Sequence, residues 1–362
     1  MTGVLPRVSA ERVEQAVSSG TYLGVQLYVS VGTEVWADIA VGERIPGAAM
    51  GTDDSVPWSC CSKPLGALAL GLLFEEGALT PETRVSSVLP EYGAGGKTDV
   101  TLAHLLSHSV PYNVEGEDNT PILHVPHEQA LAIVCARSLV DPPGSRALYS
   151  PFGSWTVVAE IVARLTGAGF FDFVEREVLR PLEMREVTFG NARATARGPG
   201  SVSDLYLGGD EGFHVHPLLN VEEALRPGSP GSGAHGPARE LARVFECLAH
   251  GGWWNGKRVL GQKAVRALSS TVRHGLPDPA FCDLDLRWGL GFCTDNALFS
   301  APRGARLVGH TGFRCALAIG DLDRRIVIAF LSTSVTDGAL GRGRLVAQIV
   351  RDVYAAVDAG HR

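Results

Sequence analysis

The chain has 362 residues, 45% of them hydrophobic and 20% charged, which is ordinary for an enzyme built from two intertwined subdomains. The formal net charge of -7, without a block of basic residues, argues against non-specific nucleic-acid binding. Seven irregularly spaced cysteines without a CxxC pair, and eleven histidines without an HExxH pattern, predict reduced thiols and no metal or other cofactor.

The N-terminal residues contain no apolar signal segment, and no stretch of about 18 apolar residues occurs anywhere in the chain. We therefore expect a cytoplasmic protein that has no membrane partner.

The first quarter of the chain predicts a helix, a hairpin and a second helix. Residues 9–20 form an amphipathic pattern with Ser9 as a plausible N-cap, and residues 24–43 alternate as two antiparallel strands around Gly32. A segment from about residue 60 to 76 is apolar nearly all round, which predicts a buried helix that ends at Gly77.

The middle of the chain predicts helices, and the last third predicts strands and a closing helix. Helices are expected after Thr101, over residues 150–167, and within 170–184 up to Pro181, and the Gly-, Pro- and Ser-rich stretch 226–240 is expected to open another helix. The segments "RWGLGFCTD", "RLVGHTGFRCALAIGD" and "RRIVIAFLST" predict three strands, and "GRLVAQIVRDVYAAV" predicts the final helix.

This order predicts an α/β (α+β) fold in which an antiparallel sheet is flanked by helices and carries a large, mainly helical insertion. We expect residues 1–58 and 285–362 to form the sheet domain and residues 59–284 the helical domain, with the active site at their interface. The segments around 112–145 and 199–235 are expected to line the substrate pocket.

The stretch "SCCSK" places Cys60 three residues before Lys63, at the predicted start of the buried helix. Residues i and i+3 share a helix face, and backbone N–H groups at a helix start favour negative charge. Lys63 is therefore placed to take the proton of Cys60 or to hold its anion. By itself the pattern is weak, because unpaired cysteines are often simply buried.

Two further motifs follow in order. "ALYSPFG" supplies Tyr149 just before a predicted helix, and "VGHTGF" supplies His310, Thr311 and Gly312 on a predicted strand. Each alone is compatible with packing. In this order and spacing they resemble the SxxK, YxN and KTG motifs of acyl-transfer sites.

With these motifs the chain resembles the serine β-lactamase and penicillin-binding-protein superfamily, in particular the class C-like branch of esterases, D-aminopeptidases and acyltransferases. The resemblance covers about residues 20 to 335 and implies a β-lactamase/transpeptidase-like fold. "VTLAHLLSHS", "WGLGF" and "GHTGF" are similar to the family's sequence around the site.

The resemblance also implies roles for individual residues. Cys60 matches the nucleophilic serine, Lys63 the motif lysine and Tyr149 the tyrosine that shuttles a proton. His310 stands where relatives have lysine or histidine. The backbone N–H groups of Cys60 and Phe313 would form the oxyanion hole, each worth about 3–4 kcal/mol to the transition state. Trp58, Thr311 and Gly312 would contact substrate, although packing is an equal alternative for Trp58.

The chain departs from the family pattern at three places. Cysteine replaces the nucleophilic serine, Pro151 replaces the asparagine of the tyrosine motif, and "HSVPY" replaces the usual Ser-Gly segment. In the family that asparagine helps to hold the substrate amide, so the exchange disfavours β-lactam or peptide substrates. His108, within the altered segment, is expected to be structural.

A cysteine at this position would form a thioester acyl-enzyme, and thioesters exchange readily with amines and thiols. We therefore expect an acyltransferase that passes an acyl group from a thioester or ester donor to an amine or hydroxyl of a small molecule, as in natural-product tailoring. The donor could be a carrier-protein or CoA thioester. The nucleophile could also be Ser59, four residues before Lys63, or Cys61, which should point towards the core.

Two other functions remain open from the sequence. An esterase, thioesterase or β-lactamase-like hydrolase would use the same residues. A catalytically silent binding module would account for the lost serine and asparagine, but it gives no reason to retain Lys63, Tyr149 and the HTG strand.

Overall fold

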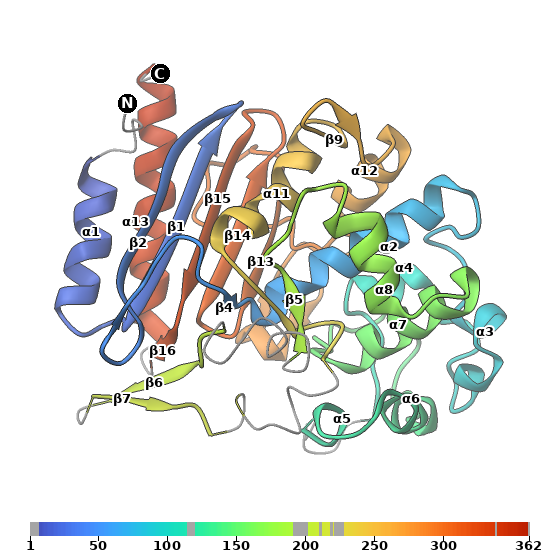
Figure 1. Cartoon of the computed structure of the whole chain (residues 1–362). Coiled ribbons are helices and arrows are strands. Elements are labelled where there is room, and N and C mark those ends of the chain that lie inside the picture. Colours follow the sequence, from blue (N-terminus) through green and yellow to red (C-terminus); the bar gives the residue numbers. More distant parts are fainter. Residues whose placement is uncertain are drawn as a thin grey trace.

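The computed structural model describes residues 7–113, 120–190, 202–209, 212–217, 220, 228–336 and 339–360. Among these residues a six-stranded antiparallel sheet has the strand order β13-β14-β15-β1-β2-β3 (Figure 1). Its strands are β1 (Gly24–Val31), β2 (Glu34–Ile45), β3 (Ala48–Ala49), β13 (Leu307–Gly312), β14 (Ala316–Asp321) and β15 (Ile326–Ser332).

The N-terminal hairpin and the C-terminal strands share this sheet, as the sequence predicted. Strand β1 pairs antiparallel with β15, with Val25 opposite Ser332 and Val31 opposite Ile326. Strands β1 and β15 are rich in β-branched residues, and β1, β14 and β15 are buried almost throughout, which suits a sheet that is covered on both faces.

Helices cover the two faces of the sheet (Figure 1). On one face lie α1 (Arg7–Ser18) and α13 (Ala339–Asp358), which pack on a core that includes Val25, Leu27 and Phe330. The second, larger core lies on the opposite face. It involves α2 (Lys63–Glu75), α7 (Gly153–Thr166), α11 (Ala238–Ala249) and α12 (Gln262–Ser269).

Shorter elements complete the described chain. The helical ones are η1 (Ser59–Ser62), α3 (Val85–Val88), η2 (Pro90–Gly93), α4 (Leu102–Leu106), α5 (Thr120–Leu123), α6 (His127–Ala136), α8 (Phe170–Val174), the π-helical η3 (Glu175–Leu179) and η4 (Pro279–Phe281). The strands are β4 (Val56–Pro57), β5 (Thr188–Phe189), β6 (Tyr206–Gly209), β7 (Gly212–Val215), β8 (Ala234–Gly236), β9 (Trp253–Trp254), β10 (Lys257–Arg258), β11 (Pro277–Asp278), β12 (Leu284–Asp285) and β16 (Ser334–Thr336).

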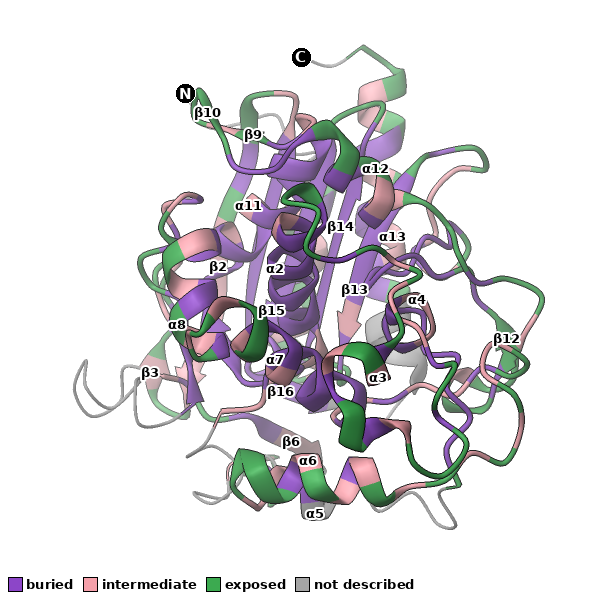
Figure 2. Ribbon diagram, turned by 90° about the vertical axis from the view of Figure 1, so that its right-hand side faces the viewer, coloured by how far each residue is buried: buried purple, intermediate pink, exposed green. Residues whose placement is uncertain are grey.

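Helix α2 is the central buried helix, coloured almost uniformly as buried in Figure 2. It contacts α7, α8 and α12, so apolar residues all round its circumference find partners. This packing fixes the start of α2, and with it the turn that carries Cys60.

The division into a sheet domain and a helical domain stays a prediction. One element of the segment 59–284, α11, packs on the sheet, where it contacts β1, β14 and β15. Its buried Glu246 accepts hydrogen bonds from Tyr28 (3.0 Å) and Ser30 (2.6 Å), both on β1.

Three predicted elements differ from the structure. "RWGLGFCTD" forms isolated bridges instead of a strand, because Gly291 has a φ of +83° and turns the chain so that its N–H donates to the carbonyl of Leu106 at 3.0 Å. "RLVGHTGFRCALAIGD" is a hairpin of β13 and β14 instead of one strand. The helix predicted from residue 170 up to Pro181 divides into α8 and a π-helical turn that ends at Leu179.

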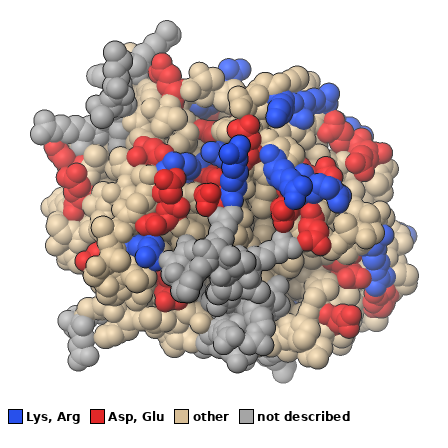
Figure 3. Space-filling model, viewed as in Figure 1, with Lys and Arg blue, Asp and Glu red and all other residues tan. Residues whose placement is uncertain are grey.

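Acidic and basic side chains are interspersed on the face shown in Figure 3. Among the described residues, no helix is long and apolar enough to cross a membrane.

Candidate active site

Cys60 lies in the 3-10 turn η1, immediately before α2 begins at Lys63. In a 3-10 turn, residues i and i+3 lie directly above one another, so the Lys63 side chain is aligned with that of Cys60. Both lie where the sheet meets the helical layer, because η1 contacts β13, β14 and β8 as well as α2.

Three neighbouring side chains could serve as nucleophile, and the structure separates them. Cys61 is fully buried and its thiol donates to the carbonyl of His310 at 3.3 Å, so it faces the core. Ser59 and Cys60 both line the cavity described below. Of these two, Cys60 interacts with both Lys63 and Tyr149.

Ser59 has a positive φ of 51°, a left-handed conformation that is costly for a non-glycine residue. Such strain is often found beside functional residues, where the surrounding structure holds an unusual turn. Here it lies directly before Cys60 and helps to aim that thiol into the cavity.

Lys63 is completely buried, and its ammonium donates to the backbone carbonyl of Gly231 at 2.9 Å. Burial lowers the pKa of Lys63, and the hydrogen bond and charge of Cys60 oppose that shift. Because its pKa is lowered towards that of a thiol, Lys63 can exchange a proton with Cys60 at a moderate cost in free energy. Its Nζ lies 5.3 Å from the centre of the Tyr149 ring.

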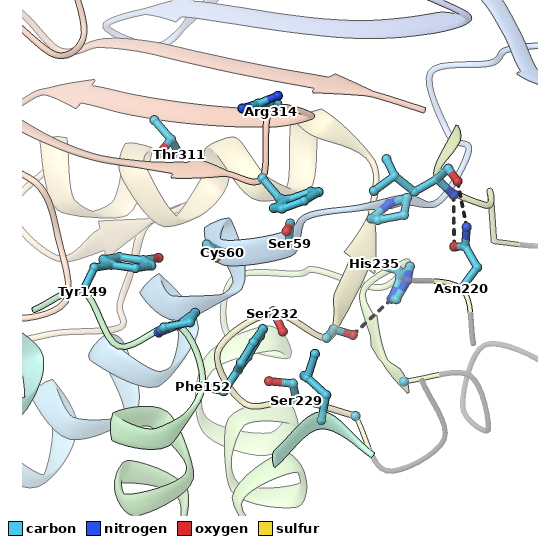
Figure 4. A pocket seen from close by; sticks show the side chains of 18 of the residues that line it. Ser59, Cys60, Tyr149, Phe152, Asn220, Ser229, Ser232, His235, Thr311 and Arg314 are labelled. Carbon is cyan, nitrogen blue, oxygen red and sulfur yellow. Dashed lines mark hydrogen bonds between the residues drawn. The ribbon is translucent and has the colours of Figure 1, made fainter. Parts of the chain in front are cut away.

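Tyr149 points its hydroxyl towards Cys60 (Figure 4). Burial raises the pKa of Tyr149, as do its charge interaction and hydrogen bond with Cys60. The phenol is therefore protonated at neutral pH and can donate a hydrogen bond or pass on a proton.

A buried ion pair supports the backbone at Tyr149. The carboxylate of Asp278 pairs with Arg273 at 3.1 Å and accepts a hydrogen bond from the N–H of Tyr149 at 3.4 Å. Arg273 in turn donates to the carbonyl of His108 at 2.9 Å. The Arg273–Asp278 ion pair thus connects the backbone at Tyr149 with the backbone at His108.

Two histidines flank Tyr149. The His108 ring lies 4.3 Å from the Tyr149 ring and accepts a hydrogen bond from the N–H of Ser150, which fits the structural role predicted for it. The His310 ring lies 6.4 Å away. Its Nδ1 donates to the carbonyl of Thr311 at 2.7 Å.

Burial and the charge of Lys63 together lower the pKa of His310 to about 3, against the opposing effect of the hydrogen bond to Thr311. At neutral pH the ring is uncharged, and its Nε2 is a buried acceptor without a partner among the described residues. His310 therefore adds no cation beside Lys63.

Strand β13 brings the HTG motif next to η1. A Cβ on Gly312 would lie 2.4 Å from the carbonyl oxygen of Trp58, so only glycine permits this approach. Thr311 and Phe313 line the cavity, whereas Gly312 contributes the close contact with η1 instead of a surface for substrate.

Trp58 does not line the cavity. It is fully buried, and its indole N–H donates to the carbonyl of Gly236 at 2.9 Å. The assignment of Trp58 to the substrate site is therefore wrong in this structure, and the packing alternative holds, because the indole is enclosed between η1 and β8.

The cavity in front of Cys60 has a volume of about 470 Å³. Figure 4 shows Thr311 and Arg314 on one side of Cys60 and Phe152, Ser229 and Ser232 on the other. Its lining also includes Leu123, Asn220 and His235, which lie in the two segments that the sequence predicted to form the pocket. Within those segments, residues 114–119, 199–201, 210–211, 218–219 and 221–227 are outside the described residues.

Sequence reasoning missed the segment that holds Lys63. Pro151 offers no side-chain amide, and the carbonyl of Gly231 binds the lysine instead. A Cβ on Gly231 would lie 2.9 Å from the carbonyl oxygen of Pro151, so glycine is needed there. The Gly- and Ser-rich composition of this stretch was a signal, but it indicated only a loop.

Among the described residues, no group of three or more His, Cys, Asp or Glu side chains could hold a metal ion.

Comparisons with known proteins show the family of the chain and similar folds. A sequence model of the family described as Beta-lactamase matches residues 10–351. The chain is 25% identical over 336 residues to the "Esterase/beta-lactamase LipL" of Mycobacterium tuberculosis, a match that covers 83% of this chain and 73% of that protein.

Two solved structures have a similar fold. A penicillin-binding protein homologue from Caulobacter crescentus gives a TM-score of 0.82 at 23% identity, covering 98% of this chain and 99% of its own. EstCE1, described as a hydrolase with promiscuous acyltransferase activity, gives a TM-score of 0.79 at 20% identity, covering 96% and 99%.

Proposed function

Because the chain belongs to the beta-lactamase family, we propose that it is an acyltransferase in which Cys60 carries the acyl group as a thioester. The donor is an acyl thioester or ester of a small molecule, of CoA or of a carrier protein, and the acceptor is an amine or hydroxyl. This is a tailoring reaction of the kind used in natural-product biosynthesis.

The observation that carries the proposal is the placement of Cys60. Of the three adjacent candidates, it is the side chain that both lines the cavity and interacts with Lys63 and Tyr149. A nucleophile beside a base, with the base itself held by a third group, is the arrangement that covalent catalysis requires. Here the third group is the carbonyl of Gly231.

In the first half-reaction the sulfur of Cys60 attacks the donor carbonyl, and the thiol proton passes to the neutral amine form of Lys63, which returns a proton to Tyr149 when Tyr149 protonates the leaving group. The oxyanion that forms is stabilised by the N–H groups of Cys60 and Phe313. When the tetrahedral intermediate collapses, the bond to the donor's thiol or alcohol breaks, and this leaving group receives the proton from Tyr149.

In the second half-reaction the amine or hydroxyl of the acceptor attacks the thioester carbonyl and gives its proton to the neutral amine of Lys63. The bond between the carbonyl carbon and the Cys60 sulfur breaks, and the thiol recovers its proton. The protein ends in its starting state, and the only net change is the transfer of the acyl group.

Hydrolysis is the second candidate function, because LipL is named an esterase and β-lactamase and EstCE1 a hydrolase. Transfer ranks above it for two reasons. The nucleophile is a thiol, whose acyl-enzyme is reactive towards amines, and the lining beside it includes the apolar side chains of Phe152, Phe281 and Phe313.

The test is the partition of products. The protein is incubated with an acyl thioester in the presence and absence of a small primary amine, and amide and free acid are quantified. We expect amide to exceed acid, Cys60→Ala to abolish both, and Cys282→Ala, which removes an exposed thiol, to change neither. Free acid alone would favour the hydrolase, and no product from any donor would favour a silent binding module.

A further inference from the structure

A second cavity, of about 260 Å³, lies beside the one that contains Cys60. Leu123, Gly228 and Ser229 line both cavities, so the two share a boundary. The second cavity is lined mainly by residues of α5, α6, α7 and α8, which lie in the lower right part of Figure 1. We call it the side cavity.

The lining of the side cavity is mainly apolar. It includes Ile122, Ala130, Ala159, Phe170 and Phe171. A charged or strongly polar group placed there would lose its hydration without gaining partners, whereas an alkyl chain would gain from leaving water.

Three polar side chains of the side cavity, those of Thr156, His127 and Glu160, already have partners. The hydroxyl of Thr156 donates to the carbonyl of Phe152 at 3.2 Å. The carboxylate of Glu160 is engaged by His127 at 3.0 Å and by Arg164 at 2.9 Å. These groups therefore do not call for a polar ligand.

The boundary between the cavities consists of small or adaptable residues. Gly228 has no side chain, and Leu123 is a half-buried, flexible side chain. Figure 4 shows Ser229 on the side of the catalytic cavity opposite Thr311 and Arg314. A chain attached to the Cys60 sulfur would reach the side cavity by passing this boundary.

From this geometry we propose that the side cavity receives the alkyl part of the donor's acyl group, so that the enzyme prefers medium-length, uncharged acyl chains such as octanoyl over acetyl. The proposal rests on the proposed function, because it concerns the acyl group that Cys60 carries. The acceptor, which must present an amine or hydroxyl, remains in the polar part of the catalytic cavity.

The test is to fill the side cavity. Ala163 lies on α7, is partly exposed and lines the side cavity, so Ala163→Leu adds volume there and retains a good helix-forming residue. Ala159→Leu does the same from a buried position on α7. Ala132→Leu on α6 is the matched control, because Ala132 is exposed and outside the cavity lining.

The readout is kcat/KM for loading Cys60 with acetyl, butyryl and octanoyl thioesters of the same thiol. In the wild type each methylene that enters the side cavity should raise kcat/KM by up to about fourfold. Ala163→Leu should lower the value for octanoyl by about tenfold or more, leave that for acetyl within about twofold, and so flatten the dependence on chain length. Ala132→Leu should behave as the wild type.

Three results would overturn the inference. The first is a wild type without preference for longer chains, and the second is an equal loss for acetyl and octanoyl in both filled variants. The third is a loss that appears only in the KM of the acceptor, which would assign the cavity to the acceptor instead. If no donor loads Cys60 at all, the proposed function itself fails, which is a separate outcome.

Discussion

At the scale of single residues, the local backbone separates Cys60, which lines the cavity together with Ser59, from the buried Cys61. Ser59 adopts a φ of 51°, Cys60 faces the cavity, and Cys61 bonds to the back of β13. The chemistry of the side chains alone would not distinguish Cys60 from Cys61, since both are thiols. The turn that precedes α2 makes this distinction.

Lys63 is expected to control the reactivity of Cys60. Lys63→Met retains the length of the buried side chain but removes its charge and its proton. Because the ammonium no longer stabilises the thiolate and no amine accepts the proton, kcat/KM for acyl transfer should fall by on the order of 10²–10⁴. The rate of Cys60 alkylation by iodoacetamide at neutral pH should fall with it.

Lys257→Met, at an exposed position on β10, serves as the control and should leave both rates unchanged. Alkylation of Cys60 at the wild-type rate in Lys63→Met would mean that the lysine has only a packing role.

At the scale of elements, the site depends on how closely β13 approaches η1. Gly312→Ala would place a Cβ 2.4 Å from the carbonyl of Trp58, and the backbone atom on the other side cannot rotate away. We expect a loss of about 1–3 kcal/mol in the free energy of unfolding. Acyl loading should fall by about a hundredfold, because a small shift of β13 displaces the N–H of Phe313.

Urea unfolding and loading kinetics check this prediction. Gly51→Ala is the control, since its Cβ would meet Asp54 only at an ordinary 3.6 Å. Full activity of Gly312→Ala would show that the contact between β13 and η1 does not position the site.

The buried pair of Arg273 and Asp278 joins the loop before α7 to β11. Asp278→Ala leaves the guanidinium buried without its counter-charge, so unfolding should become easier by about 3–5 kcal/mol. Asp323→Ala breaks an exposed pair with Arg306 and should cost less than about 1 kcal/mol. Equal losses in thermal or urea unfolding would contradict the role given to the buried pair.

At the scale of the whole molecule, two buried histidines make stability depend on pH. Burial lowers the pKa of His235 to about 4, and burial together with Lys63 lowers that of His310 to about 3. Unfolding raises both towards the ordinary value of about 6.5, so the unfolded chain binds protons that the folded protein does not. Their contribution to stability is complete above about pH 6.5 and is lost as the pH falls towards 4 and 3.

Between its folded-state pKa and about pH 6.5, each histidine should lower the free energy of unfolding by about 1.4 kcal/mol for each pH unit of acidification. Urea unfolding between pH 7 and pH 4 measures this slope, and His235→Asn should reduce it. His274→Asn removes an exposed histidine and should leave the slope as it is. A slope that His235→Asn does not change would contradict the assignment of a buried neutral imidazole.

Much of the fold could be predicted from local patterns. The hairpin 24–43, the buried helix that ends at Gly77 and the capping of α4 by Thr101 follow from residue spacing and are present in the structure. "RWGLGFCTD" was predicted as a strand because its apolar residues alternate. Its glycines, however, turn the chain into contact with α4, and that contact is not visible in the sequence.

The candidate site could also be predicted only in part, because some of its residues lie in recognisable motifs and others lie in loops without a pattern. The order of Cys60, Lys63, Tyr149 and His310 indicated which residues meet, since a motif order can be recognised. The carbonyl of Gly231 that holds Lys63, and the ion pair of Arg273 and Asp278 below Tyr149, come from loops that carry no such pattern. Trp58 adjoins the nucleophile in sequence, but its indole is directed into the core.

The most direct test of the central claim is the mass of the intact protein after brief exposure to an octanoyl thioester, followed by peptide mapping of the adduct. The account predicts one octanoyl group on Cys60 in the wild type, removed by hydroxylamine, and no adduct in Cys60→Ala. An adduct on Ser59 or Cys61, or one that persists in Cys60→Ala, would contradict it.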